Sequence, residues 1–280
     1  MTVLYVSSFN EEIYKASGKN LLQSFAKNNV EDAICVGYEG FEIAKDITET
    51  GIAQILCVPL DNDVILRKVF LENIDLIPEY INLKHNDESL WGKLKVCKCK
   101  KPWGKREDAH TPGCKFTWWN RNFIRWFRKV LTLYHAKKFV LENEARVKLD
   151  YIVWVDSDAE FINFLPESKI KEVMGDYDTF YMKGRRKTVE TGIVGFNLNQ
   201  RGGELIGEWL NFYTSQDFRV CDRFDDGYIY DYIVTKMRSY KARDIVSPNC
   251  HDTEVARHSR LSGFIQHNKG LHGRVLGIMK

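Results

Sequence analysis

Two aspartates one residue apart, Asp156 and Asp158, directly follow the apolar run from Ile152 to Val155. Carboxylates this close repel each other, and each loses hydration if the end of the strand is covered by protein. The arrangement is physically reasonable where a positive charge lies beside the pair. Mg²⁺ and Mn²⁺ prefer carboxylate oxygens and share their other positions between water and phosphate. The pair therefore predicts a divalent-metal site for a nucleotide diphosphate.

Two other interpretations of the aspartate pair stay open at this point. Strands commonly stop at polar residues, so the pair could form a solvated strand end. A D-x-D at a strand end is also typical of phosphatases of the haloacid-dehalogenase type, in which the first aspartate is the nucleophile. Those enzymes usually carry Thr or Val after the motif, near the start of the catalytic domain. Here Ala159 and Glu160 follow, in the middle of the chain.

The elements that must position the aspartates alternate between strands and helices. Apolar runs at residues 2–10, 32–40 and 51–60 predict three strands, and residues 19–28 predict an amphipathic helix. Residues 149–156 predict the buried strand that ends at the pair. Ligands of open α/β sheets bind at the carboxyl ends of strands, so we expect an α/β fold with the pair at that edge.

The longest helical pattern runs from Phe116 to about Val147. Its aromatic and aliphatic residues recur every three to four positions and predict a face buried in the core. Arg121, Arg125 and Arg128 lie on another side of this helix. A solvated face, an anionic acceptor or peripheral contact with a membrane surface would each suit these arginines.

The composition of the 280 residues is that of a soluble globular protein, and we expect a single domain. No stretch approaches the ~20 apolar residues of a membrane span, and the first residues lack the pattern of a signal peptide. A cytoplasmic location is therefore expected. The net charge of +3 is too small to indicate nucleic-acid binding. An oligomeric state is not indicated.

An irregular stretch at about 94–115 is rich in Lys, Gly and Pro and predicts a surface insertion. It contains four residues of the types that bind zinc, namely Cys97, Cys99, His110 and Cys114. Their C-x-C spacing is tighter than in most zinc sites, so free thiols in a reduced cell are the alternative.

Six segments together resemble one known family. One of them, FRKVLTLYHAKKF at 127–139, resembles a basic helix that precedes a metal-binding strand. LDYIVWVDSDAEFIN at 149–163 looks like a metal-binding D-x-D strand, and LYVSSFNEEIYKASGKNLLQSF at 4–25 is similar to a nucleotide-binding first strand and helix. ETGIVGFNLN at 190–199 and RFDDGYIYDYI at 223–233 look like segments that face the transferred sugar, and HNKGLHG at 267–273 resembles an H-x-x-G element that closes over a diphosphate. The family is that of the GT-A-fold glycosyltransferases, with the glycogenin-like retaining group nearest.

The resemblance implies a GT-A fold, in which helices flank a Rossmann-like mixed central sheet. It implies transfer of a sugar from a nucleoside diphosphate sugar, the expected donor being a UDP-sugar, to a hydroxyl of a glycan, protein or lipid-linked acceptor. The metal would be Mn²⁺ or Mg²⁺. The reaction would retain the configuration of the sugar, and residues 262–280 would form a C-terminal lid. A protein that binds nucleotides or carbohydrates without catalysis on the same fold is the alternative.

Carried over by position, the resemblance also assigns roles to residues. Asp156, Asp158 and His267 would bind the metal, and Asp226, Glu190 and Asp225 would face the sugar as hydrogen-bond acceptors or as a base. The nucleotide and its diphosphate would contact Ser7, Ser8, Asn10, Tyr14, Lys129, Asp156, Ser157, Lys269 and Gly270. From the residues alone, Asp225 and Asp226 could equally begin a helix, and His267 could be a surface histidine in a glycine-rich tail.

Overall fold

The computed structural model describes residues 3–29, 31–41, 43, 52, 54–73, 123–146, 148–186, 188–221, 223–237, 239–250 and 255–268. The expected insertion at 94–115, with its Cys and His residues, lies outside this part of the chain. So do Lys269, Gly270 and the rest of the expected lid beyond Asn268.

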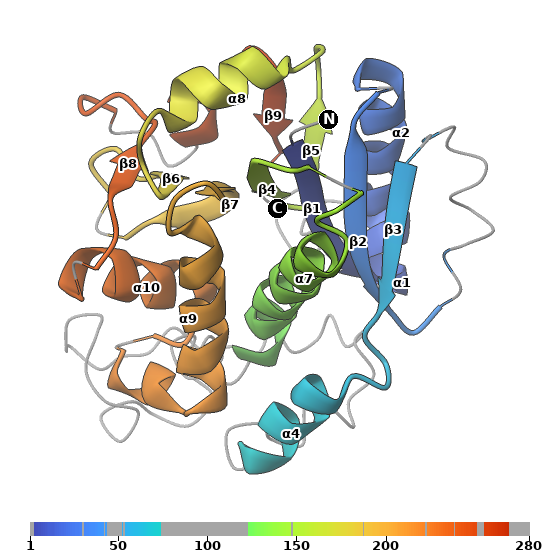
Figure 1. The fold of residues 1–280 in the computed structure, drawn as a ribbon, viewed down its shortest axis with the longest axis vertical. Coiled ribbons are helices and arrows are strands. Elements are labelled where there is room, and N and C mark those ends of the chain that lie inside the picture. The colour runs from blue at the N-terminus through green and yellow to red at the C-terminus, as the bar shows by residue number, and fades with distance from the viewer. Residues whose placement is uncertain are drawn as a thin grey trace, which may run out of the picture.

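A seven-stranded mixed sheet, in the order β3-β2-β1-β4-β7-β6-β8, forms the centre of the molecule (Figure 1). The first four strands of this order are parallel, β7 runs antiparallel to β4 and β6, and β8 is parallel to β6. Their bounds are β1 (Val3–Asn10), β2 (Ala33–Glu39), β3 (Gln54–Pro59), β4 (Tyr151–Val155), β6 (Thr179–Met182), β7 (Glu190–Asn197) and β8 (Ala242–Asp244). The expected α/β architecture with a mixed central sheet is confirmed.

The strand order reverses between β1 and β4. From β1 the chain adds β2 and β3 on one side of the sheet, and β4 then pairs with the other edge of β1. Such a reversal leaves a crevice at the carboxyl ends of the two strands, which is where open α/β sheets bind ligands. β1 ends at Asn10 and β4 ends directly before Asp156, so the aspartate pair begins at this crevice.

Helices cover both faces of the sheet (Figure 1). Side chains of α7, α9, α4 and α10 pack in one hydrophobic cluster, and those of α2 and α8 pack in the other. The helical segments in the described ranges are α1 (Glu11–Ile13), η1 (Tyr14–Gly18), α2 (Lys19–Asn28), α4 (Val64–Glu72), α7 (Phe123–Glu142), α8 (Glu167–Met174), α9 (Gly202–Thr214), η4 (Asp217–Val220), α10 (Asp226–Asp231), η5 (Tyr232–Lys236) and η6 (Val255–His258). None of the described helices is both long and apolar enough to cross a membrane.

The burial pattern explains why these residues form these elements. Leu4 and Val6 of β1 pack in the α7 cluster, whereas Val3 and Tyr5 pack in the α2 cluster, because successive side chains of a strand point to opposite faces. Both faces of β1 are thus covered, and its sequence is almost continuously apolar.

Phe123 and Phe127 of α7 are fully buried, as the periodicity predicted, whereas Trp126 and Tyr134 are half-buried. The helix ends at Glu142, before the predicted end at about Val147.

A separate two-stranded sheet joins the D-x-D segment to the far end of the chain. β5 (Ala159–Phe161) pairs antiparallel with β9 (Ile265–His267), and the register places Ala159 opposite His267. The outer edge of β5 bonds to α2, because the Phe161 N–H donates to Ser24 Oγ at 3.1 Å and Asn28 Nδ2 donates to the Phe161 carbonyl at 2.6 Å. The sheet therefore holds β9 beside the carboxyl end of β4.

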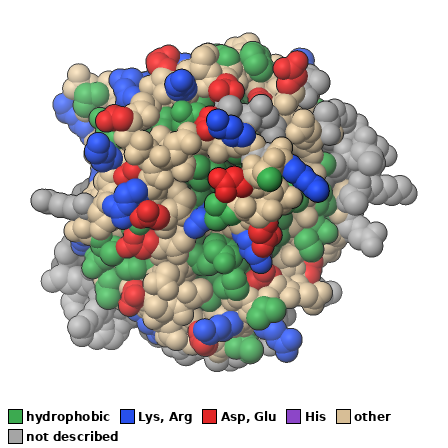
Figure 2. All heavy atoms as spheres, in the orientation of Figure 1, with side chains coloured by type: hydrophobic (Ala, Val, Ile, Leu, Met, Phe, Trp, Pro, Cys, Tyr) green, Lys and Arg blue, Asp and Glu red, His purple; other side chains and the backbone are tan. Residues whose placement is uncertain are grey.

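Charged side chains of both signs are interspersed over the face of the molecule in Figure 2, with hydrophobic side chains between them. This face carries no broad area of a single sign among the described residues. The pattern agrees with the small net charge of +3.

The burial of the Asp32 carboxyl, directly before β2, can be tested through the dependence of stability on pH. Burial raises the pKa of Asp32 to about 6, and the negative charge of Glu167 adds to this rise. The native state therefore keeps this proton to higher pH than the unfolded chain, and stability falls as the pH rises from about 4 to about 6. We expect Asp32→Asn to raise the free energy of unfolding by about 1 kcal/mol at pH 7, a small gain because Asp32 is partly exposed, and to leave it unchanged at pH 3.

Urea denaturation of both proteins at the two pH values measures this difference. Asp176→Asn is the matched control, because the Asp176 side chain is 80% exposed and its substitution should change little at either pH. An effect of Asp32→Asn that is the same at both pH values would contradict the burial of this carboxyl.

Candidate functional site

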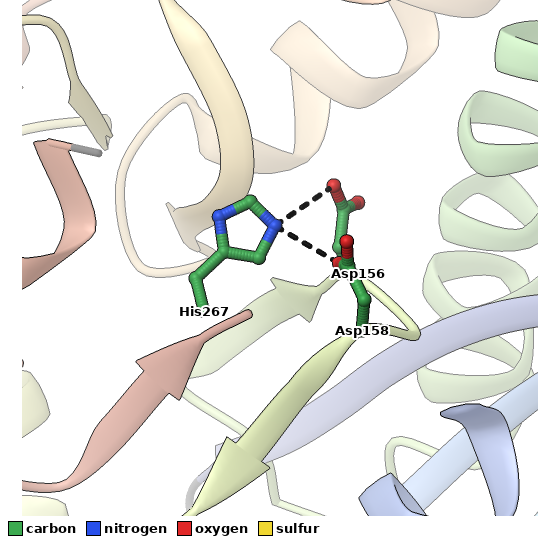
Figure 3. A group of neighbouring side chains, drawn as sticks. All are labelled: Asp156, Asp158 and His267. Atoms are coloured by element: carbon green, nitrogen blue, oxygen red, sulfur yellow. Dashed lines mark hydrogen bonds and ion pairs between the residues drawn. The ribbon is translucent and has the colours of Figure 1, made fainter. Parts of the chain in front are cut away.

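Asp156, Asp158 and His267 converge at the carboxyl end of β4 (Figure 3). One ligand atom from each residue lies within 4.8 Å of the other two. His267 Nε2 lies 2.9 Å from Asp158 Oδ1 and 3.8 Å from Asp156 Oδ2. His267 and Asp158 are 6% and 9% exposed, so this part of the site is largely shielded from bulk water.

Backbone hydrogen bonds fix the three residues relative to one another. The Asp156 N–H donates to the Gly192 carbonyl of β7 at 2.8 Å, and the Ala159 N–H donates to the Asp156 carbonyl at 3.0 Å. The Asn268 N–H, directly after His267, donates to the Asp158 carbonyl at 2.9 Å. The chain thus turns sharply between the two aspartates and is tied at that turn to β7 and β9.

The chemistry of this donor set fits a divalent cation. Two carboxylates and one imidazole are ligands that Mn²⁺ accepts, and the imidazole favours a transition-metal ion over Mg²⁺. The carboxylates also act on the histidine. Burial lowers the pKa of His267, but the hydrogen bond and charge of Asp158, with the charge of Asp156, raise it by more, so the pKa lies above its ordinary value. The site therefore favours positive charge at this position.

Lys129 of α7 supplies a second cation under the aspartates. Its Nζ lies 2.9 Å from Asp156 Oδ1 and 2.5 Å from Asp226 Oδ2, and the residue is 6% exposed. Burial lowers the pKa of Lys129, but the charges of Asp156 and Asp226 raise it by more, so the pKa is above its ordinary value. Lys129 is therefore a permanent positive charge that joins the aspartate of β4 to the aspartate of α10.

The two oxygens of Asp156 have different surroundings. Oδ1 accepts hydrogen bonds from Lys129 and, at 2.6 Å, from the indole Nε1 of Trp154. Oδ2 faces His267. Burial raises the pKa of Asp156, but Lys129 and His267 lower it by more. Asp156 is thus held as a carboxylate that turns one oxygen toward the candidate metal position.

Asp226 is bound within the same network. Its Oδ2 accepts a hydrogen bond from Thr191 Oγ1 at 2.7 Å, and Lys129 Nζ donates to the Thr191 carbonyl at 3.0 Å. Asp226 Oδ1 accepts from the Gly227 N–H at 3.0 Å. β7, α7 and α10 thus meet at one buried carboxylate.

Asp225 has a structural role that the sequence already allowed. It begins α10, and its Oδ1 accepts a hydrogen bond from the Tyr228 N–H at 3.0 Å, as a helix N-cap does. It also pairs with Arg223, whose guanidinium lies over the ring of Tyr228. Burial raises the pKa of Asp225 to about 6, although Arg223 acts in the opposite direction.

Glu190, at the start of β7, pairs with Arg186 at 2.7 Å. Its charge contributes to the raised pKa of His267, so Glu190 lies within the electrostatic reach of the candidate metal position. The Arg125 guanidinium of α7 lies within the field of Asp158 and Asp156, although its pKa is lowered, chiefly by the surrounding protein. Arg125 itself is exposed to solvent.

The expected nucleotide contacts lie at the end of β1 and just beyond it. The Ser7 hydroxyl is fully buried and has no hydrogen-bond partner among the described residues, whereas Ser8 is half-buried. The Asn10 side chain accepts from the Ile13 N–H and caps α1, and the ring of Tyr14 packs against Phe9. Ser157 lies in the turn between the two aspartates. Contact of these residues with a nucleotide stays a prediction.

Three residues that contact the aspartates of the site were not assigned a role from the sequence. Trp154 stands two residues before Asp156 on the same face of the strand, and this spacing was a signal for its hydrogen bond. Thr191 contacts Asp226 from a different element, which no local spacing indicates, whereas Arg223 stands two residues before its partner Asp225.

The sequence matches no protein-family model and no curated protein. Solved structures that are similar include the glycosyltransferase GlyE of Streptococcus pneumoniae, at 10% identity and a TM-score of 0.47 over 87% of this chain and 45% of that chain. Mouse xyloside xylosyltransferase 1 has 9% identity and a TM-score of 0.45 over 88% and 85% of the two chains. A glycosyltransferase involved in glycosylation of the major capsid of PBCV-1 has 10% identity and a TM-score of 0.48 over 99% and 98%.

This chain thus spans less than half the length of GlyE. At TM-scores below 0.5 these similarities carry no weight for function. We derive the function from the residues of the site.

Lys129→Met tests whether the buried lysine compensates the aspartates. The substitution keeps the length of the side chain but leaves Asp156 and Asp226 without their shared cation. Removing one partner from a buried ion pair typically costs 3–5 kcal/mol, so we expect a loss of about 3 kcal/mol in the free energy of unfolding at pH 7 without metal.

Urea denaturation measures this loss. The control is Lys138→Met on the same helix, because the Lys138 side chain is 55% exposed and its contact with Glu142 is 3.7 Å long. That change should stay within about 0.5 kcal/mol. Equal stability of Lys129→Met and the wild type would show that the aspartates do not depend on Lys129.

Proposed function

We propose that this protein is a metal-dependent glycosyltransferase that uses a nucleoside diphosphate sugar, a UDP-sugar being the favoured donor. The observation that carries the proposal is the convergence of Asp156, Asp158 and His267 at the carboxyl end of β4, beside the reversal of strand order. An ion held there would have positions left for phosphate oxygens, at the edge where α/β sheets bind nucleotides. The resemblance of six sequence segments to GT-A enzymes supports the same conclusion.

The chain's own residues would hold and orient the donor. Asp156 Oδ2, Asp158 and His267 would bind Mn²⁺, which supplies Lewis-acid stabilisation of the departing diphosphate when it is bound. Lys129 and Trp154 would keep Asp156 oriented, since both donate to its other oxygen. Ser7, Ser8, Asn10, Tyr14 and Ser157 would face the nucleoside, and Lys269 and Gly270 would approach the diphosphate.

Asp226 is our favoured contact for the transferred sugar. Carboxylates form strong, charge-assisted hydrogen bonds with hydroxyl groups, and Asp226 is fixed by Thr191 and Lys129 next to the candidate metal centre. Glu190 and Asp225 would complete the sugar side of the site from β7 and the start of α10.

The ion pairs of the three acidic residues favour a retaining reaction. An inverting transferase needs a carboxylate base that takes the proton of the acceptor hydroxyl. Among the described residues, Asp226 pairs with Lys129, Glu190 with Arg186 and Asp225 with Arg223. Each of these carboxylates is thus already engaged by a cation and would have to leave that partner before it could take a proton from the acceptor. Retention without a dedicated protein base agrees better with these pairs.

Hydrolysis and transfer assays with a panel of UDP-sugars, in Mn²⁺ and in EDTA, test the proposal. A transferase should release UDP slowly with one donor and only with the metal. Mn²⁺-dependent binding without turnover would instead identify a non-catalytic nucleotide-binding protein. Hydrolysis of simple phosphate monoesters would favour the haloacid-dehalogenase type, although the occupied oxygen of Asp156 makes it a poor nucleophile.

Asp158→Asn should abolish the metal-dependent reaction while the fold is retained. The substitution preserves the shape of the side chain. It relieves the repulsion with Asp156 but weakens the contact of residue 158 with His267, so stability without metal should change little. Loss of one carboxylate ligand should reduce turnover at least about 100-fold, because the metal contributes several kcal/mol to charge stabilisation.

Steady-state turnover at saturating Mn²⁺ and calorimetric affinity for UDP are the measurements. Glu160→Gln in β5 is the control, because it removes a nearby half-buried carboxylate that is not a candidate ligand. Turnover of Asp158→Asn equal to that of the wild type would rule out the proposed metal site.

A further inference from the structure

Gly192 of β7 lies against the ring of His267. A Cβ atom added at residue 192 would stand 2.7 Å from Cε1, 3.0 Å from Nδ1 and 3.1 Å from Nε2 of the histidine. Real Cβ contacts are essentially never shorter than 3.0 Å. The imidazole therefore occupies the volume that any other residue type would fill with its side chain.

The His267 ring has little freedom to avoid such a side chain. It is 6% exposed, and its Nε2 is held 2.9 Å from Asp158 Oδ1. Its backbone belongs to β9, which pairs with β5, and the following N–H is bonded to the Asp158 carbonyl. Displacement of the ring would therefore break its contact with Asp158 or disturb the pairing of the two strands.

The backbone of residue 192 also holds a second candidate ligand. The Gly192 carbonyl accepts the hydrogen bond from the Asp156 N–H at 2.8 Å. The Gly192 carbonyl thus binds the backbone at the start of the D-x-D turn, and the absence of a side chain at Gly192 leaves space for the imidazole of His267. It is the point at which residues 111 positions apart in the chain, 156 and 267, are brought together.

We infer that Gly192 is a positioning residue for the candidate metal centre, required because only glycine leaves room for His267 beside both aspartates. The expected effect of Gly192 on metal affinity rests on the proposed function, which includes a metal centre. The contact between residue 192 and the imidazole is independent of that function. Residues that orient metal ligands without binding the metal typically change metal affinity 10–100-fold when they are substituted.

A double-mutant cycle of Gly192→Ala and His267→Ala tests the inference with two measurements on the full chain. Without metal, Gly192→Ala alone should lower Tm by roughly 2–4 °C because of the steric conflict. In the His267→Ala background the methyl group meets no ring, so the same change should lower Tm much less. Titration with Mn²⁺, followed by electron paramagnetic resonance, should show affinity reduced about ten-fold or more by Gly192→Ala, and no further reduction when His267 is already absent.

Gly263→Ala is the matched control. It lies in the turn that leads into β9, and a Cβ atom added there meets nothing within 4 Å. It should leave Tm and Mn²⁺ affinity close to those of the wild type.

The outcomes separate this inference from the proposed function. Wild-type Mn²⁺ affinity in Gly192→Ala, or equal losses with and without His267, would overturn the positioning role of Gly192 and leave the metal centre intact. A wild-type protein that binds no Mn²⁺ would overturn the metal centre itself, and the Tm cycle would then still decide whether residue 192 determines the place of the histidine.

Discussion

Three carboxylates lie close together at one largely buried place, and their mutual repulsion is the constraint on which the rest of the site depends. Asp156, Asp158 and Asp226 come from the end of β4, the following turn and the start of α10. They are compatible with burial because Lys129 bridges Asp156 and Asp226, and because His267 bonds to Asp158. Each cation belongs to a different part of the fold, so α7 and β9 must both be in place before the aspartates are compensated.

The fold meets this constraint through long-range pairing. α7 packs beneath the parallel half of the sheet and directs Lys129 toward the end of β4, where the strand order reverses. β9 returns from the far end of the chain and pairs with β5, whose outer edge is bonded to α2. The same contacts that compensate charge also bring the candidate ligands together, so stability and function share their residues here.

Local patterns in the sequence were sufficient for much of the fold. α2 ends where its amphipathic pattern predicted, at residue 28, and the run before Asp156 forms the buried strand β4. The helical segment begins earlier than predicted, because α1 and η1 lead into α2 without a break from Glu11. The approach of His267 to Asp158 was different, because 109 residues separate them and no periodicity encodes that contact. It was expected only through the family resemblance. Packing between elements brings Asp226 to Thr191, and it places His267 against Gly192. The spacing of these residues in the sequence does not indicate either contact.

The charges of the site determine which further charges are needed when a metal and a nucleotide bind. Lys129 keeps its proton, because the carboxylates around it hold its pKa above the ordinary value. A metal binds the unprotonated Nε2 of His267, so it would compete there with the proton that the neighbouring carboxylates favour. A nucleoside diphosphate brings further negative charge to a place that already holds three carboxylates. Further cations near the site would therefore strengthen the binding of a donor.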